Sequence, residues 1–136
     1  MTAFDTNVLV RVLLGDDPVQ TALAEAAFLE HAAADGVYVS RLVMAELAWV
    51  LGRGYRLDRS SIHERLTSLV RTRGVFVEQP EPTLEALRRF AAGPADLADY
   101  LILLSAAEDG AAPLLTFDRR LAPDPGASLL TTASDD

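Results

Sequence analysis

The chain has 136 residues, half of them hydrophobic, and a formal net charge of −8. This length fits one compact domain with its own core, which we expect over residues 1–132, followed by a frayed tail at 133–136. Cysteine is absent, which excludes disulfides and thiolate metal sites. The negative charge argues against binding nucleic acid through overall electrostatic attraction, so any such binding depends on local features.

The basic residues and the apolar runs indicate which ligand and which cellular location suit the protein. All 12 basic residues are arginine, the side chain best suited to bidentate phosphate contacts, so the basic groups present suit RNA. The start of the chain lacks the basic and apolar regions of a signal peptide, and no apolar run is long enough to span a bilayer. We therefore expect a cytoplasmic protein with no membrane segment.

The predicted elements alternate between strands and helices. The predicted strands are Thr2–Asp5, Val37–Val39, Val75–Val77, Pro113–Thr116 and Ala127–Leu130. Between them the pattern predicts helices over about 18–34, 41–53, 58–73, 82–92 and 96–110. Gly36, Gly74 and Gly110 each stand where a helix would close before the next strand. This order predicts an α/β, doubly wound domain with a central parallel sheet of about five strands flanked by helices.

Two acidic residues follow predicted strands. Asp5 ends the first strand and Asp118 follows the fourth, so both belong at the carboxyl edge of a parallel sheet, where sites of such folds lie. Each also has a structural alternative. Asp5 is a suitable cap for a helix beginning at Thr6, and Asp118 can pair with Arg119 or Arg120 in a turn.

Other acids stand within or beside apolar helical segments. Glu46 is the only polar residue of Leu42–Leu51, which predicts a helix buried on all sides and a carboxylate that is paired, protonated or bound to a metal. A salt bridge to an arginine is the alternative. Asp96 and Asp99 lie three residues apart at the start of a helix, where they can act as cap and capping-box acid. They also share one side of that helix, where two carboxylates repel unless a cation separates them.

Together these acids predict a site for a hard cation. Carboxylate oxygens suit Mg²⁺ or Mn²⁺, whereas zinc is disfavoured without cysteine and with only His31 and His63, both in polar helical contexts. Clustered carboxylates with Mg²⁺ are the usual equipment for phosphodiester hydrolysis. The large apolar side chains Phe28, Leu29, Trp49 and Phe90 are most simply core residues.

Four segments in order resemble the successive motifs of PIN domains, and most closely those of VapC toxins from bacterial toxin–antitoxin pairs. They are Phe4–Arg11, Ser40–Leu47, Asp96–Ile102 and Leu115–Leu121, and the resemblance covers nearly the whole chain. It implies a doubly wound α/β fold and an endoribonuclease that needs Mg²⁺ or Mn²⁺. It also implies a homodimer inhibited by a small cognate antitoxin protein.

The resemblance assigns roles by position. Asp5, Glu46 and Asp99 match the three most regular acids, Asp118 the more variable fourth, and Asp96 an acid often found before the third. All five are candidate metal ligands, and Asp5, Glu46, Asp99 and Asp118 are the candidate catalytic residues. Thr6 and Thr116 match hydroxyl positions that orient acids or water near the site.

Candidate RNA contacts and competing functions complete the prediction. Arg11, Arg41 and Arg119 adjoin the acidic motifs and are expected to contact phosphates, unless they form ordinary surface pairs. Arg53, Arg56 and Arg59 form a further basic cluster. A phosphotransfer or receiver domain is disfavoured because the chain has no lysine to hold a phosphoryl group. A PIN-like module that binds RNA without cleaving it, or one that is not a toxin, remains the alternative.

Overall fold

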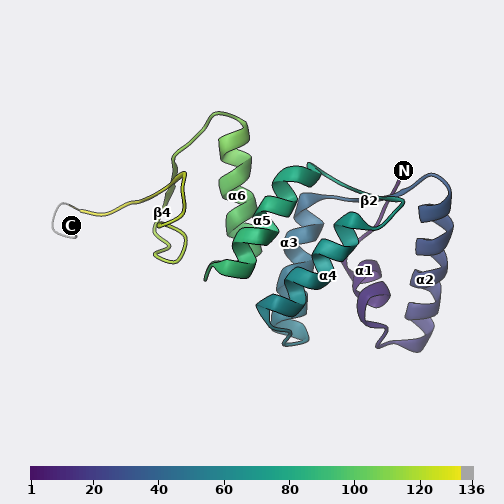
Figure 1. The fold of residues 1–136 in the computed structure, drawn as a ribbon. Helices are drawn as coiled ribbons and strands as arrows, with labels where there is room; N and C mark the ends of the chain where they lie inside the picture. The colour runs from purple at the N-terminus through teal and green to yellow at the C-terminus, as the bar shows by residue number, and fades with distance from the viewer. Residues whose placement is uncertain (133–136) are drawn as a thin grey trace.

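The computed structural model describes residues 1–132, so the predicted tail at 133–136 lies outside the described residues. In chain order the elements are β1 (Thr2–Ala3), α1 (Thr6–Leu14), α2 (Pro18–Ala33), β2 (Val37–Val39), α3 (Arg41–Trp49), the π-helical turn η1 (Val50–Gly54), α4 (Arg59–Arg71), β3 (Val75–Val77), α5 (Pro80–Ala92), α6 (Leu97–Glu108), β4 (Leu114–Thr116) and β5 (Ala127–Leu129) (Figure 1). The predicted alternation of strands and helices is confirmed.

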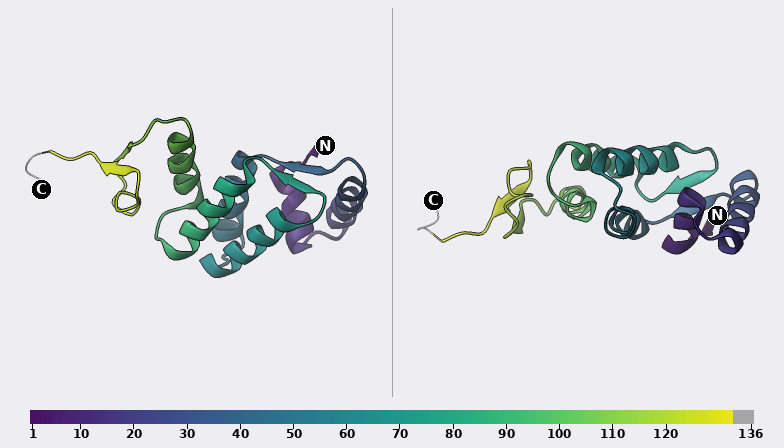
Figure 2. Two further views of the ribbon diagram at one scale, coloured as in Figure 1. Left: turned by 45° about the horizontal axis from the view of Figure 1, so that its top comes forward. Right: turned by 90° about the horizontal axis from the view of Figure 1, so that it is seen from below.

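The strands form two separate parallel sheets. β2 pairs with β1 on one side and with β3 on the other, and β4 pairs only with β5. The α/β class and the parallel pairing are confirmed, but the single sheet of about five strands is not what forms. In Figures 1 and 2 the β4–β5 pair lies at the opposite end of the molecule from the three-stranded sheet, beyond α6.

The separation has a physical basis in the short first strand and in where β4–β5 is anchored. β1 spans only Thr2 and Ala3 before Asp5 starts the next helix, so it offers few backbone groups to a further strand. Leu121, in the loop between β4 and β5, is buried in the core, and Arg89 of α5 lies 3.8 Å from Asp124 of the same loop. These contacts hold the pair against α5 and α6.

Acidic and hydroxyl caps set the helix boundaries. Asp5, Asp17, Ser40 and Asp58 each accept a hydrogen bond from a backbone N–H in the first turn of the helix they precede. A side-chain oxygen at this position satisfies a donor that has no partner within the helix. The predicted helix over 41–53 ends as an α-helix at Trp49 and continues as the π-helical turn η1, in which the Tyr55 N–H bonds to the Val50 carbonyl.

The predicted glycines lie in the turns that lead into β2 and β3, two residues after the C-cap residues Ala34 and Thr72 of the preceding helices. Gly36 and Gly74 have φ angles of 96° and 86°, a left-handed conformation that glycine adopts at little cost. At Gly74 a β-carbon would also collide with the backbone of Ala32 in α2. The close approach of β3 to α2 therefore depends on glycine at this position.

The core lies between the three-stranded sheet and the helices that cover it. Val37 and Val39 of β2 are fully buried. They belong to one core cluster with Leu47 of α3, Leu66 of α4 and Tyr100 of α6. A core this continuous provides most of the stability of a domain. No helix within residues 1–132 has the length and apolar character needed to cross a membrane.

Two of the four predictions of core residues are wrong. Phe90 is buried and Phe28 packs half-buried with its ring edge against Phe4, but Leu29 and Trp49 are exposed. Both lie on the outward faces of their helices. Trp49 is 63% exposed because α3 packs through Met44, Leu47 and Ala48 instead.

Candidate active site

The first group of site residues joins the start of α1 to α3. Asp5 directly follows β1 and caps α1, with its Oδ1 accepting a hydrogen bond from the Thr6 N–H at 2.7 Å. The buried Thr6 hydroxyl donates to Glu46 Oε1 at 3.0 Å. Thr6 therefore links two carboxylates that lie far apart in the sequence. We call Asp5, Thr6 and Glu46 the α1–α3 acid group.

The environment of Glu46 differs from the sequence prediction. The expected all-buried helix is wrong, since Glu46 is exposed on a face of α3 that also carries exposed Leu42 and Trp49. One side of α3 alone meets the core, because the neighbouring helices cover only that side. An exposed carboxylate avoids the desolvation cost of burial and remains open to a ligand.

The second group gathers at the start of α6 and the end of β4. Asp96 caps α6, and its N–H donates to Asp99 Oδ2 at 3.0 Å, as the predicted capping box requires. Asp118 follows β4, and its N–H donates to Thr116 Oγ1 at 2.9 Å, so Thr116 fixes the turn that carries the acid. We call Asp96, Asp99 and Asp118 the α6–β4 acid group.

Arg120 lies among the three carboxylates of the α6–β4 acid group. Its Nη2 is 3.1 Å from Asp118 Oδ2 and 4.0 Å from an oxygen of each of Asp96 and Asp99. Hydrogen bonds from the Arg120 side chain and backbone hold the pKa of Asp118 below its usual value, and Asp118 raises the pKa of Arg120 in return. A guanidinium thus offsets the repulsion that three close acids would otherwise suffer.

The five predicted metal ligands are therefore divided. Among residues 1–132 no three histidine or acidic side chains are placed to share one ion, and Asp5 and Glu46 are not brought to Asp99 and Asp118. The donor chemistry still fits a hard cation, since both groups present carboxylate oxygens. Asp5 and Glu46 would supply oxygens from one side, and Asp96, Asp99 and Asp118 from the other.

The predicted RNA-binding arginines divide in a similar way. Arg11 donates to Gln20 and pairs with Asp16 at 2.9 Å, and Arg41 donates to Ser105 and pairs with Glu108 at 3.1 Å. Both have the ordinary surface pairs that were the alternative to RNA contacts. Within the described residues Arg119 has no such pair. It is exposed beside Phe117 in a shallow cavity of about 360 Å³.

An exposed tryptophan beside the site was missed in the sequence. Trp49 lines a cavity of about 260 Å³ together with Arg53 of η1 and Asp96 of the α6–β4 acid group. Its spacing from Glu46, three residues along α3, was the available signal, because residues three apart share one helix face. Arg59, predicted to join Arg53 in a basic cluster, instead donates to the carbonyls of Phe90 and Ala95 and stacks over the Phe90 ring.

The architecture and the acids together define a class of protein. The protein is an α/β domain that carries acids after parallel strands and at helix N-termini. This arrangement is suited to metal-assisted hydrolysis of phosphodiesters. Residues 3–123 match the PIN domain family, and because this match spans most of the chain, the protein belongs to that family. The comparison with curated proteins returned no match.

Membership of the PIN domain family confirms the predicted family and indicates a broad class of activity. PIN domains are generally nucleases that use divalent metals and act on nucleic acids, which places this protein in the nuclease class of hydrolases. The matched range contains every predicted acidic site residue, from Asp5 to Asp118.

Proposed function

We propose that this protein is a Mg²⁺- or Mn²⁺-dependent endoribonuclease that hydrolyses RNA phosphodiester bonds. The observation that carries the proposal is the Thr6 hydroxyl, which is buried and donates at 3.0 Å to Glu46 while the Thr6 N–H donates to Asp5. Thr6 thus fixes two carboxylates, Glu46 through its hydroxyl and Asp5 through its N–H, and leaves their remaining oxygens free. Such preorganisation of acids is what a cation site requires.

In this proposal the acids have different roles. Asp5, Glu46 and Asp99 would hold the ion once the α1–α3 and α6–β4 acid groups come together, and Asp118 and Asp96 would help to hold a second ion or the attacking water. A bound ion supplies a water of lowered pKa and positive charge at the leaving oxygen. A neighbouring carboxylate orients that water and takes up its proton. Attack by water leaves a 5′-phosphate and a 3′-hydroxyl.

The substrate side rests on local arginines, since the net charge of −8 repels RNA at long range. Arg119 is exposed next to Asp118 and is the proposed phosphate contact among the predicted arginines. Arg11 and Arg41 would first have to exchange their carboxylate partners for phosphate. Trp49 offers an exposed ring beside Arg53, on which a splayed base can stack.

The proposed biological setting is that of a cytoplasmic toxin of the VapC type. The four segments that resemble VapC motifs support it, as does the acidic site, to which an antitoxin can present a basic side chain. In this setting a small cognate antitoxin blocks the acids and a homodimer is the active form. An RNA-binding module without cleavage activity is the alternative, and metal-dependent cleavage separates the two.

Cleavage of a labelled RNA with Mg²⁺ or Mn²⁺ tests the proposal. We expect Asp5→Asn to lower the cleavage rate at least about a hundredfold, because the change removes one negative ligand and leaves the shape intact. Asp17→Asn is the matched control, since Asp17 also caps a helix, α2, but lies outside both acid groups. It should retain activity.

The products supply a second criterion. Cleavage by water gives 3′-hydroxyl ends, whereas a 2′,3′-cyclic phosphate would mean attack by the ribose hydroxyl and would overturn the proposed chemistry. RNA binding without cleavage by the wild-type chain under both metals would favour the binding-module alternative. Equal loss of activity in Asp5→Asn and Asp17→Asn would assign the effect to helix capping.

A further inference from the structure

The cavity beside Trp49 lies where several helical segments meet, and we call it the Trp49 cavity. Its lining comes from α3 and η1, from the start of α4, from the end of α5 and from the start of α6. Ala45, Ala48 and Gly52 are among the lining residues, and their small size leaves space beside the indole ring. The volume of about 260 Å³ lies below the range of about 300–1,000 Å³ that is usual for drug-sized ligands. The cavity therefore suits one flat ring system better than a peptide.

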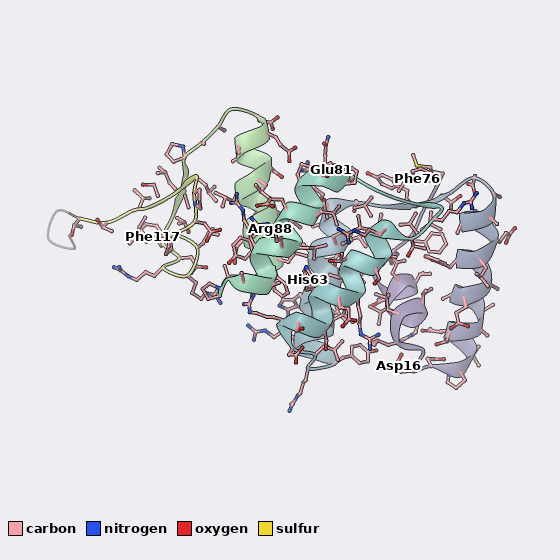
Figure 3. The ribbon with its side chains drawn as sticks, viewed as in Figure 1. Asp16, His63, Phe76, Glu81, Arg88 and Phe117 are labelled. Carbon is pink, nitrogen blue, oxygen red and sulfur yellow. The ribbon has the colours of Figure 1, made fainter. Side chains whose placement is uncertain are left out.

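Two aromatic rings line the Trp49 cavity, and only one of them is available to a ligand. Trp49 is exposed, whereas Phe90 is buried and its ring is covered by the Arg59 guanidinium, 4.5 Å from the ring centroid. Another exposed ring, that of Phe117, lies beside the β4–β5 pair (Figure 3) and takes no part in the lining. Trp49 is therefore the ring on which a flat ligand in this cavity can stack.

The charged side chains that line the cavity differ in how far they are already engaged. Arg59 donates to three backbone carbonyls between Phe90 and Ala95, so it belongs to the fixed wall. Within residues 1–132 Arg53 has no hydrogen bond or ion pair. The side chain of Asp96 is 54% exposed, and its nearest guanidinium nitrogen is 4.0 Å away. The cavity thus offers a free cation and an open carboxylate beside an exposed ring.

Guanine is the nucleobase that matches this pair of charges. Its N1–H and N2–H groups point in the same direction, so both can donate to the two oxygens of one carboxylate. Its O6 and N7 accept from one guanidinium, the commonest specific contact of arginine with a base. Adenine, cytosine and uracil lack two such donors side by side on different atoms. In a duplex the N1–H and N2–H of guanine are paired with cytosine, so an unpaired guanine is required.

We propose that the Trp49 cavity binds a guanine base of single-stranded RNA. The base stacks on Trp49, Asp96 accepts hydrogen bonds from N1–H and N2–H, and Arg53 donates to O6 and N7. Base binding stands on the cavity alone, whereas its consequence for cleavage rests on the proposed function.

The cavity adjoins the acids of both groups. Glu46 lies three residues before Trp49 on one face of α3, about 4.5 Å along the helix axis. This rise is comparable with the spacing of about 3.4 Å between stacked nucleotides of one strand. Asp96 is then engaged by the base, which leaves Asp118 to assist the ion or the attacking water. A bound guanine therefore places a neighbouring phosphodiester near Glu46, and cleavage should occur next to guanine.

Tryptophan fluorescence tests base binding without metal and without cleavage. Trp49 is the only tryptophan in the sequence, so quenching by a stacked base reports this cavity alone. The probes are the RNA pentanucleotides UUGUU, UUUUU and a version of UUGUU with inosine in place of guanosine, each titrated in EDTA. Inosine lacks only the N2 amino group of guanosine. We expect UUGUU to bind at least about fivefold more tightly than either other probe, because hydrogen bonds to a charged group are strong.

Replacement of the carboxylate tests which group selects the base. Asp96→Ser keeps a favoured cap at the start of α6 but is too short to reach the base. We expect this variant to bind the guanosine and inosine probes with affinities equal within about twofold, which loss of folding alone would not produce. Arg53→Ala should weaken binding of UUGUU by about fivefold while its preference over inosine remains.

Replacement of the ring tests stacking, with binding followed by the anisotropy of end-labelled UUGUU. Trp49→Ala should weaken binding about tenfold, and Trp49→Phe should retain most of the affinity because phenylalanine also stacks. Leu42→Ala is the matched control. Leu42 is exposed on α3, seven residues before Trp49, but it does not line the cavity, so its loss should leave the affinity unchanged.

The outcomes separate the base site from the nuclease. Equal binding of the guanosine and inosine probes by the wild-type chain, or a preference that persists in Asp96→Ser, would overturn the guanine assignment. No quenching by any probe, or equal loss in Trp49→Ala and Leu42→Ala, would overturn the base site. Guanine-selective binding without cleavage under Mg²⁺ or Mn²⁺ would refute the nuclease and leave the base site. Cleavage at positions unrelated to guanine would refute the base site and leave the nuclease.

Discussion

The three-stranded sheet and the β4–β5 pair share parallel pairing and short strands, yet they differ in how they are covered. Val37 and Val39 of β2 are fully buried, whereas Leu115 of β4 is mostly exposed and only Leu121 of the adjoining loop enters the core. A two-stranded unit is marginal in water unless other elements cover it. Pairing alone therefore does not make a stable region, and coverage by helices accounts for the difference.

Truncation of one leucine in each region should give the largest contrast. Leu66 of α4 is fully buried, so Leu66→Ala should lower the free energy of unfolding by about 2–5 kcal/mol. Leu115→Ala should cost less than about 0.5 kcal/mol in dilute protein. Urea denaturation followed by circular dichroism measures both.

Loss of the anchor should release β4–β5 without unfolding the rest. Leu121→Ala removes the one side chain of the loop that is buried among core residues. We expect the opening free energy of the pair to fall by about 2 kcal/mol. Hydrogen exchange of the Leu114 and Leu130 amides, which bond across the pair, reports this opening. Equal acceleration of exchange in β2 would instead show that the two regions unfold together.

Removal of Arg120 should leave the negative charge of the α6–β4 acid group uncompensated. Arg120→Ala leaves Asp96, Asp99 and Asp118 without their shared cation, so we expect Mn²⁺ to bind about fivefold more tightly, roughly 1 kcal/mol. Isothermal titration calorimetry measures the affinity. Arg119→Ala, which removes a neighbouring charge outside this contact, is the control and should change it little. Weaker Mn²⁺ binding in Arg120→Ala would contradict the competition between guanidinium and metal.

The smallest expected effect concerns Asp35, whose hydrogen bonds connect Thr2 of β1 with His31 of α2. Asp35 accepts hydrogen bonds from the Thr2 hydroxyl and His31, which hold the pKa of Asp35 below its ordinary value of 3.8. Because the folded-state pKa is the lower one, this stabilisation is complete well above pH 3.8 and is lost as the pH falls below it. Asp35→Asn should therefore lower the urea midpoint slightly at pH 7, and the difference from wild type should shrink toward pH 2.

A control at an acid without these partners completes the pH experiment. Asp109 is exposed just after α6, and Asp109→Asn should follow the wild-type pH profile. If the difference between Asp35→Asn and wild type stayed constant between pH 7 and pH 2, the ionised carboxylate would not be its source.

Local features of the site were predictable because they depend on neighbours in sequence. Asp5, Asp96 and Asp99 occupy the cap positions expected from their place before apolar helical segments. Their spacing shows that Glu46 and Trp49 share one face of α3, but the exposure of that face was not predictable. An apolar run shows that a helix can be buried, but the number of elements that surround it decides how much of it is.

The sequence by itself determined the α/β class, the order of elements and the positions of the acids, because caps, glycines and apolar periodicity act over a few residues. Only the tertiary structure decided that Thr6 bridges Asp5 to Glu46, that Arg120 gathers Asp96, Asp99 and Asp118, and that β4 stays apart from β1. These outcomes depend on contacts between residues tens of positions apart, whose geometry is set by how whole helices pack.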